Sequence, residues 1–516
     1  MQRALIPSVL FAVGFSLVAY IGVGSLTWPM YFDHTQYAFV GDTIMAGGTP
    51  YRDAWDLKGP LTYYLFGWSR SLLGRSEISI RLVDLFVIVP LFSWQLHSLQ
   101  LKLGGRPFGA ALAVLLFLIF YFGSGYHWTA QPDDWAAMLI CVSVVFLLDA
   151  TRTHVVNTIY AAVAIALAVL LKPTYLVFAP LLAFRPSILK ISSKENVLQF
   201  LLGSVAMTFI VSAFYLWALR HGGLRELIDA YSFARQDYPH DWLSYSELNA
   251  FLDALGSVGM VIPYVLVPVG LYSILRTGLS AIARILAVWF FLGILMVIYQ
   301  NVYWIYELTA AYIPAILTIS LLVDTLRQRV SLEFPEWRHP LDGIILLFVG
   351  YIFLSPLIST TFFSTLPWPA YALGANGTED YSVRVTESDE RRKVIEGIAA
   401  YLTENTAMDD KVQSWGCEFG GIQLAKRPVA TRFGTAWPMM ENTSLKERYR
   451  EKFLQELSIS QPKVIFVEAQ FPKAVNYFPQ FARFLSDHYE FGGTVESCQV
   501  WIWKTPTVEK SNSIAQ

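Results

Sequence analysis

Long apolar segments, separated by short polar breaks, occupy the first 362 positions of the chain. Such segments are typical of transmembrane helices, which need about 20 predominantly apolar residues to cross a bilayer core of about 30 Å. Several are shorter, so we expect them to draw on flanking aromatic residues or to lie inside a bundle. The eleven predicted spans are about Leu5–Thr27, Ile78–Leu96, Phe108–Phe122, Trp135–Leu148, Val155–Leu171, Thr174–Phe184, Val197–Leu219, Val258–Leu275, Ile285–Tyr299, Leu308–Leu322 and Leu341–Phe362.

The positions of Lys and Arg predict the orientation of these spans, because short cytoplasmic loops retain positive charge. With the N-terminus in the cytoplasm, every cytoplasmic break contains at least one basic residue, whereas the two shortest outer loops, at about 123–134 and 300–307, contain none. An odd number of spans then places the end of the chain outside. The sequence therefore predicts a multi-pass protein of the plasma (inner) membrane.

A different pattern begins after position 363, where the density of charged residues roughly doubles. Segments with helical periodicity alternate with strand-like segments, an order that predicts a small α/β domain. The predicted helices are Glu390–Thr403, Ser444–Leu457 and Lys473–Asp487, and the predicted strands are Lys411–Cys417, Lys463–Glu468 and a pair within Tyr489–Lys504 that is broken at Gly492 and Gly493.

We therefore expect a polytopic α-helical membrane protein with an extracytoplasmic α/β domain. Residues 1–363 form the transmembrane module, with outer loops at about 28–77, 123–134 and 220–257, and residues 364–516 form the α/β domain. In the first loop, Pro60–Leu73 has the composition of a helix that lies in the membrane interface.

Composition supports the membrane assignment and excludes some partners. Hydrophobic residues make up 54% of the chain and charged residues 15%, against about 25% charged in soluble domains. The net charge of −2 and the lack of a long basic run exclude a nucleic-acid partner.

The three cysteines lack the paired spacing of a zinc site. Cys417 and Cys498 lie in strand-like segments of one domain, where they either form a disulfide or, as the favoured interpretation, remain two buried thiols.

Carboxylates lie at the outer ends of two predicted spans. Asp33 follows the first span in FDHTQY, and Asp133 and Asp134 precede the fourth in YHWTAQPDDW. Partly desolvated ionised groups at this depth tend to be paired or functional, although loop charges at the water boundary are the simpler interpretation. Lys58, beside Pro60 in YRDAWDLKGPL, favours function, because a cation fixed by a rigid turn suits a lipid phosphate.

These motifs resemble those of the GT-C superfamily of polyprenyl-phosphate-sugar glycosyltransferases, in particular the bacterial branch related to aminoarabinose transferases and protein O-mannosyltransferases. The similarity covers nearly the whole chain. It rests on Asp33 with Tyr37, on GGTPYRDAWDLKGPLTYY, on QPDD, on the KPT that begins at Lys172, on YWIYELTAAYIP, and on DDKVQSWGCE followed by KRPVATRF.

The resemblance implies roles for particular residues. Asp33 corresponds to the general base, Lys58 to the lysine that contacts the donor phosphate, and Asp133 to the second-loop acidic residue, with Asp134 as its alternative. The family's Lys-Pro-Pro is Lys-Gly-Pro here, and a position that is often Arg in aminoarabinose transferases is Gln36. These departures leave the phosphate to Lys58, helped by Arg52, and argue against aminoarabinose as the sugar.

Other residues are weaker candidates for the cavity. His34 either tunes the adjacent base or is an exposed loop histidine, and the second interpretation is favoured. Lys172 either meets a carboxylate or extends toward water at a helix end. The remaining cavity candidates are Tyr37, Tyr303, Tyr306 and Glu307.

The predicted function is that of an inverting glycosyltransferase, which moves a sugar from a polyprenyl-phosphate donor to an acceptor hydroxyl of an envelope glycan, lipopolysaccharide or protein. Its partners are then the membrane lipid, the donor and the acceptor, with no cofactor and no expected divalent metal. A transporter or lipid flippase is the main alternative, which would favour duplicated halves and charges at the membrane midplane. A membrane scaffold without catalysis would leave Asp33, Lys58 and Asp133 without a shared role.

Overall fold

The computed structural model describes residues 2–149, 151–183, 194–237, 261–276, 280–300, 304–334, 338–349, 363–374, 381, 389–468 and 478–504. The chain divides into two compact units. The first unit comprises Met1–Gly47, Leu57–Gly222 and Tyr238–Glu387, and the second Gly48–Asp56, Gly223–Asp237 and Ser388–Gln516. The second unit thus begins at 388 rather than near 364, and it includes a segment from each of the two long outer loops.

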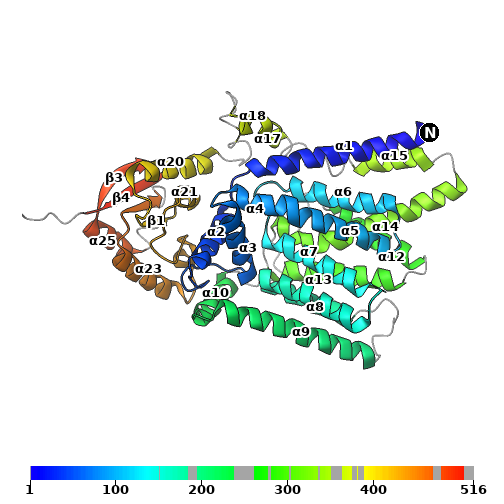
Figure 1. The fold of residues 1–516 in the computed structure, drawn as a ribbon, viewed down its shortest axis with the longest axis horizontal. Helices are drawn as coiled ribbons and strands as arrows, with labels where there is room; N and C mark the ends of the chain where they lie inside the picture. The colour runs from blue at the N-terminus through cyan, green and yellow to red at the C-terminus, as the bar shows by residue number, and fades with distance from the viewer. Residues whose placement is uncertain are drawn as a thin grey trace, which may run out of the picture. The chain divides into compact units, whose positions relative to one another are not determined.

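The first unit consists of helices and short helical turns in its described part (Figure 1). The main helices are α1 (Gln2–Gly24), α2 (Phe32–Met45), α3 (Pro60–Leu73), α4 (Ile78–Val83), α5 (Val89–Lys102), α6 (Pro107–Gly123), α7 (Pro132–Leu147), α8 (His154–Leu171), α9 (Lys194–Ala218), α12 (Val261–Arg276), α13 (Ser280–Gln300), α14 (Thr309–Glu333) and α15 (Arg338–Val349). The shorter elements are the 3₁₀ turns η1 (Ser25–Thr27), η3 (Pro173–Ala183) and η4 (Ile305–Leu308), the π-helical turn η2 (Asp84–Ile88), and the short helices α17 (Phe363–Thr365) and α18 (Trp368–Ala372).

Six helices of the described residues are long and apolar enough to cross a membrane, which confirms a multi-pass helical protein. The six are Ser8–Thr27, Ile78–Lys102, His154–Leu171, Val197–Ala218, Ala281–Gln300 and Ile305–Glu333. Each of the other five predicted spans contains a helix or turn that is shorter in the described residues. The shortest, Thr174–Phe184, falls on the 3₁₀ segment η3, which has a proline at position 180.

Proline and glycine explain several features of the first unit. Proline occupies the first turn of α3, α6 and α7, where its missing N–H costs no hydrogen bond. Helices α2 and α3 cross at Gly41 and Gly67, and a Cβ atom at Gly41 would lie 2.6 Å from the Gly67 nitrogen. At the end of the same pair, Arg70 donates to Asp42 of α2 (Nε–Oδ1 2.9 Å). The predicted helix Pro60–Leu73 is thus confirmed, but its arginine is used in packing.

Helix α14 is the centre of the first unit. It packs against α6, α7, α12 and α13, and every residue from Thr309 to Leu322 is buried. Helices α7, α8 and α9 pack successively against one another, and α5 packs against α6 and α7 (Figure 1). The N-terminal ends of α7 and α14 and the C-terminal end of α8 carry polar residues into this otherwise apolar bundle.

The second unit is the predicted α/β domain with two additions. Its strands form one sheet in the order β1-β2-β4-β3, in which β1 and β2 are parallel and the other pairs are antiparallel. The elements are α10 (Leu224–Asp237), α20 (Asp389–Asn405), β1 (Val412–Trp415), α21 (Gly420–Leu424), α22 (Trp437–Met440), α23 (Lys446–Ser460), β2 (Val464–Glu468), α25 (Pro479–His488), β3 (Tyr489–Val495) and β4 (Cys498–Trp503).

The predicted break at Gly492 and Gly493 is wrong. These glycines lie inside β3, where the pairing with β4 shifts between Phe491 and Gly493 in a bulge. The hairpin turns at Glu496, which has a left-handed backbone (φ 49°), and at Ser497. A glycine within a strand often marks a bulge rather than a turn.

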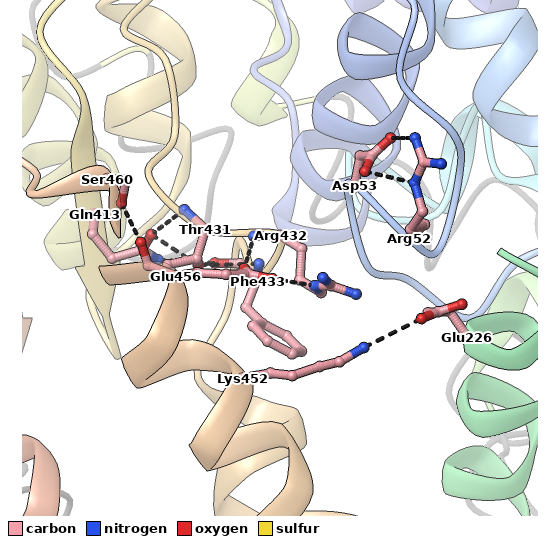
Figure 2. A network of polar contacts seen from close by, with 10 residues as sticks. All are labelled: Arg52, Asp53, Glu226, Gln413, Thr431, Arg432, Phe433, Lys452, Glu456 and Ser460. Carbon is pink, nitrogen blue, oxygen red and sulfur yellow. Dashed lines mark hydrogen bonds and ion pairs between the residues drawn. The ribbon is translucent and has the colours of Figure 1, made fainter. Parts of the chain in front are cut away.

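The two loop segments join the second unit through aromatic and charged contacts. Trp55 is buried, its backbone N–H donates to the carbonyl oxygen of Arg432 (2.8 Å), and its ring packs against Phe233 and Tyr449. Figure 2 shows the neighbouring polar network, in which Lys452 of α23 pairs with Glu226 of α10 at 3.2 Å. Local sequence patterns do not report such contacts, because the partners are hundreds of positions apart.

A disulfide joins Cys417 and Cys498, with the two Cα atoms 6.2 Å apart. It connects the residue that follows β1 by two positions to the first residue of β4. The favoured expectation of two buried free thiols is therefore wrong, and the pairing alternative is confirmed. Cys141, which is buried in α7, is free.

Candidate functional site

Five segments of the first unit bring ionisable side chains together. They are the start of α2, the turn before α3, the first turn of α7, the C-terminal end of α8 and the turn η4. The side chains are Asp33, Lys58, Asp133, Lys172 and Glu307. We call these five residues the lysine–carboxylate cluster.

Lys172 is the centre of the cluster. Its ammonium nitrogen lies 2.6 Å from Asp133 Oδ1 and 3.1 Å from Glu307 Oε1. The side chains of all three residues are nearly inaccessible to solvent, at 11%, 0% and 3% exposure respectively. Of the two interpretations of Lys172, the structure therefore supports contact with a carboxylate. Buried ion pairs are costly unless their geometry is good.

Lys58 is the second cation of the cluster. Its Nζ lies 3.7 Å from Asp133 Oδ2, beyond ordinary hydrogen-bond distance, and 5.6 Å from the centroid of the Tyr306 ring. The next residue, Gly59, donates its N–H to Leu171 O (2.9 Å), and a Cβ there would lie 2.2 Å from Leu170 O. This close approach leaves no room for a side chain at position 59. It accounts for the glycine that stands in Lys-Gly-Pro where the family has the first proline of Lys-Pro-Pro.

Asp33 lies in the first turn of α2 and is half-buried. Burial raises the pKa of its carboxyl group above the ordinary value, and the negative charge of Asp133 acts in the same direction. The ammonium groups of Lys58 and Lys172 and a hydrogen bond with Tyr37 act against this rise. A carboxylate of raised pKa is a better proton acceptor than an ordinary one.

The structure distinguishes the neighbouring carboxylates Asp133 and Asp134. Both are buried, but only Asp133 contacts the lysines. Asp134 instead accepts a hydrogen bond from the Thr309 hydroxyl at 2.6 Å, which connects α7 to the start of α14.

His34 and Tyr37 are both buried on α2. The favoured expectation of an exposed loop histidine is wrong, since His34 is 0% exposed. Its Nδ1 accepts the backbone N–H of Tyr31 (3.2 Å), which caps the helix. Burial, aided by the charge of Arg81, lowers the pKa of His34 well below its usual value. The Tyr37 hydroxyl lies 3.4 Å from Gln131 Oε1.

The structure places one of the remaining site candidates, Tyr306, beside the cluster and another, Arg52, in the second unit. Tyr306 is buried, and its ring faces the ammonium groups of Lys58 and Lys172. Arg52 belongs to the second unit, where it forms two hydrogen bonds to Asp53, at 2.9 and 2.6 Å (Figure 2). Tyr303 lies outside the described residues. Within the described residues, no three His, Cys, Asp or Glu side chains are grouped so as to hold a metal ion.

Sequence reasoning missed two contacts, one in the cluster and one beside it. The Tyr175 hydroxyl donates to the Asp133 carbonyl oxygen (2.7 Å), and Thr309 fixes Asp134. Tyr175 directly follows the KPT motif that begins at Lys172, so that motif was the available signal. There was no such signal for Thr309, because a threonine at the start of an apolar helix is a common capping residue.

Comparison with known proteins identifies the fold. No protein-family model matches the sequence, and no curated protein sequence matches it significantly. Among solved structures, the chain is similar to ArnT from Cupriavidus metallidurans bound to undecaprenyl phosphate, with a TM-score of 0.59, 14% identity and coverage of 96% of this chain and 97% of that one. It is also similar to the apo state of that protein, with a TM-score of 0.56, 14% identity and the same coverage.

A second similar protein is the archaeal oligosaccharyltransferase AglB from Archaeoglobus fulgidus, in complex with an inhibitory peptide and a dolichol-phosphate. Its TM-score is 0.50 at 11% identity, with coverage of 96% of this chain and 75% of that one. At 14% and 11% identity, these similarities show that the chain shares the fold of ArnT and AglB. The fold expected from the resemblance in the sequence is therefore confirmed.

Proposed function

We propose that this chain, which has the fold of GT-C glycosyltransferases, moves a sugar from a polyprenyl-phosphate-linked donor to an acceptor hydroxyl. The observation that carries the proposal is the lysine–carboxylate cluster, in which two cations and three carboxylates from separate segments meet within one bundle. Such a cluster offers both a proton acceptor and a phosphate-binding cation. The undecaprenyl phosphate in the similar ArnT structure and the dolichol-phosphate in AglB support a lipid-phosphate donor.

In the proposed reaction Asp33 is the general base. Its carboxylate takes the proton of the acceptor hydroxyl while the hydroxyl oxygen attacks the anomeric carbon of the donor. The bond from that carbon to the phosphate oxygen breaks, and the polyprenyl phosphate leaves with the electron pair. A single displacement of this kind inverts the configuration at the anomeric carbon.

Lys58 is the residue that we assign to the donor phosphate. Lys172 is held by two buried carboxylates, Asp133 at 2.6 Å and Glu307 at 3.1 Å. The side chain of Lys58 is the more exposed of the two lysines, at 16% against 11%, so we assign Lys58 to the phosphate. Charge-assisted contacts to phosphate stabilise the negative charge that develops on the leaving group. Asp133 then keeps Lys172 as its partner and fixes the geometry of the site.

The sugar and acceptor are proposed by class. The acceptor is a hydroxyl of an envelope glycan, lipopolysaccharide or protein. Gln36, which stands where aminoarabinose transferases often have arginine, is buried and cannot supply a positive charge, so we propose a sugar other than aminoarabinose.

Replacing Lys58 by Ala tests the phosphate assignment. We expect the apparent KM for a polyprenyl-phosphate-sugar donor to rise and turnover to fall, because the phosphate is charged in both the ground state and the transition state. The measurement is sugar transfer by purified protein in nanodiscs. Lys102→Ala is the matched control, since this lysine pairs with Asp149 elsewhere in the first unit (3.5 Å). If the apparent KM for the donor is the same in both variants and in the wild type, the assignment is contradicted.

We further propose that the active loops and the second unit lie outside the cytoplasm. The distribution of Lys and Arg supports this orientation. The Cys417–Cys498 disulfide supports it too, because disulfides persist in oxidising compartments and are rare in the cytosol.

Thiol mapping tests the orientation. When cells are lysed in denaturant with an alkylating reagent, we expect the peptides of Cys417 and Cys498 to be recovered linked, whereas Cys141 is alkylated and serves as the internal control. Recovery of both cysteines as alkylated thiols would contradict the disulfide and remove its support for the orientation.

A further inference from the structure

Two charged residues are buried side by side on a membrane-spanning helix without belonging to the lysine–carboxylate cluster. Arg81 on α4 is 1% exposed and Asp84, three positions later, is 3% exposed. Both lie in the candidate span Ile78–Lys102, where a buried charge is expensive and usually functional. Buried charges often stabilise a fold less than well-packed apolar residues would, so stability alone is a weak reason for the presence of Arg81 and Asp84.

Arg81 holds the loop that leads into α7. Its Nη1 donates to the Thr129 hydroxyl (2.6 Å), and its Nη2 donates to the carbonyl oxygens of Tyr126 (2.9 Å) and Pro29 (3.3 Å). The guanidinium also lies 5.7 Å from the Trp28 ring. One side chain thus fixes the loop at two of its positions and connects it to the segment that precedes α2.

Asp84 holds the same loop from its other end. It accepts a hydrogen bond from Trp135 Nε1 (2.8 Å) and from the Tyr121 hydroxyl (2.8 Å). That hydroxyl in turn accepts the backbone N–H of Ala130 (2.9 Å), a residue with a left-handed backbone (φ 59°). The conformation of Ala130, which is unusual for a residue other than glycine, therefore depends on a tyrosine that Asp84 orients.

Asp133 lies inside the stretch that these contacts fix. The chain is held at Tyr126 and Thr129 by Arg81, at Ala130 through Tyr121, and at Trp135 by Asp84. Between the last two points the chain makes the turn that starts α7 and presents Asp133 to Lys172.

We propose that Arg81, Asp84 and Tyr121 are positioning residues for the transfer reaction, acting by fixing the loop that carries Asp133. This inference rests on the proposed function. A displacement of about 1 Å in a catalytic group can cost about 10²-fold in rate. Loss of one fixing contact should therefore slow turnover, whereas binding of the donor phosphate by Lys58 should be unaffected.

Tyr121→Phe is the sharpest test, because loss of the hydroxyl removes both the acceptor of the Ala130 N–H and one of the donors to Asp84. Tyr312→Phe is the matched control. Tyr312 is also buried, and its hydroxyl donates to Leu116 O on α6 (3.3 Å). Both variants are measured in nanodiscs for sugar transfer, for thermal stability, and for hydrogen–deuterium exchange of the peptide that contains residues 124–135.

We expect Tyr121→Phe to lower kcat about 10-fold or more with the donor KM within about twofold, and to increase exchange in the 124–135 peptide. Tyr312→Phe should leave both quantities at the wild-type value. Unchanged exchange in Tyr121→Phe would overturn the fixing contact, and increased exchange with unchanged kcat would overturn the positioning role. If the wild type transfers no sugar from any polyprenyl-phosphate donor, the proposed function fails, while the exchange measurement still decides whether the loop is fixed by Tyr121.

Discussion

Replacing Asp33 by Asn is expected to lower turnover by about 10²-fold or more, because Asn keeps the shape of the side chain but cannot accept the proton of the acceptor hydroxyl. Binding of the lipid-linked donor should survive, since the phosphate is assigned to Lys58. The measurement is single-turnover sugar transfer together with donor binding. Asp149→Asn provides the control, because that carboxylate pairs with Lys102 outside the cluster. An Asp33→Asn variant that keeps the wild-type rate would rule out the base.

The pH dependence of the wild type follows from the same residue. The base is active as a carboxylate, so the rate should fall as the pH is lowered through the pKa of Asp33. Burial raises that pKa above its ordinary value of 3.8, and the acid limb of the profile should therefore lie above 3.8. The acid limb should be absent from the residual activity of Asp33→Asn.

Replacing Lys172 by Met should both destabilise the protein and abolish transfer. The substitution leaves Asp133 and Glu307, which are almost fully buried, without their common cation. Breaking a buried ion pair on one side costs about 3–5 kcal/mol. The measurement is the apparent Tm in nanodiscs.

A second substitution separates stability from catalysis. Lys172→Met combined with Glu307→Gln removes the charge of one of the two carboxylates that lose Lys172, so we expect it to recover part of the Tm without recovering transfer. Lys172→Arg keeps the charge and is the conservative control. If Lys172→Met melts at the wild-type temperature, the network of Asp133, Lys172 and Glu307 does not stabilise the bundle as described.

Sequence patterns predicted the local structure well where the signal is local. The helix Pro60–Leu73 was predicted with its observed bounds, because proline starts it and Gly74 follows it. The strand that became β2 was found within one residue for a similar reason, being a short apolar run between polar breaks. The hairpin turn was misplaced because two adjacent glycines suggest a turn more strongly than Glu496 and Ser497 do.

The site was less predictable, since it depends on which helix ends meet. Asp33, Lys58 and Asp133 were identified from motifs, and the structure brings them together. Lys172 was ambiguous because a lysine at the end of an apolar helix looks the same in the sequence whether it extends to water or pairs with a carboxylate. The role of Arg52 could not be judged from the sequence either. The sequence does not show that Arg52 and its neighbour Asp53 belong to the second unit, where the two side chains pair with each other.

The second unit is built from three segments that are far apart in the chain, and this affects how the protein is made. Gly48–Asp56 leaves the ribosome early, Gly223–Asp237 much later, and the sheet last. Trp55 therefore cannot contact Phe433 and Tyr449 until every membrane span that precedes these two residues has been synthesised. Completion of this unit thus depends on correct insertion of the spans, so a chain with one span inserted in the wrong direction would have its three segments on different sides of the membrane and could not close the aromatic cluster.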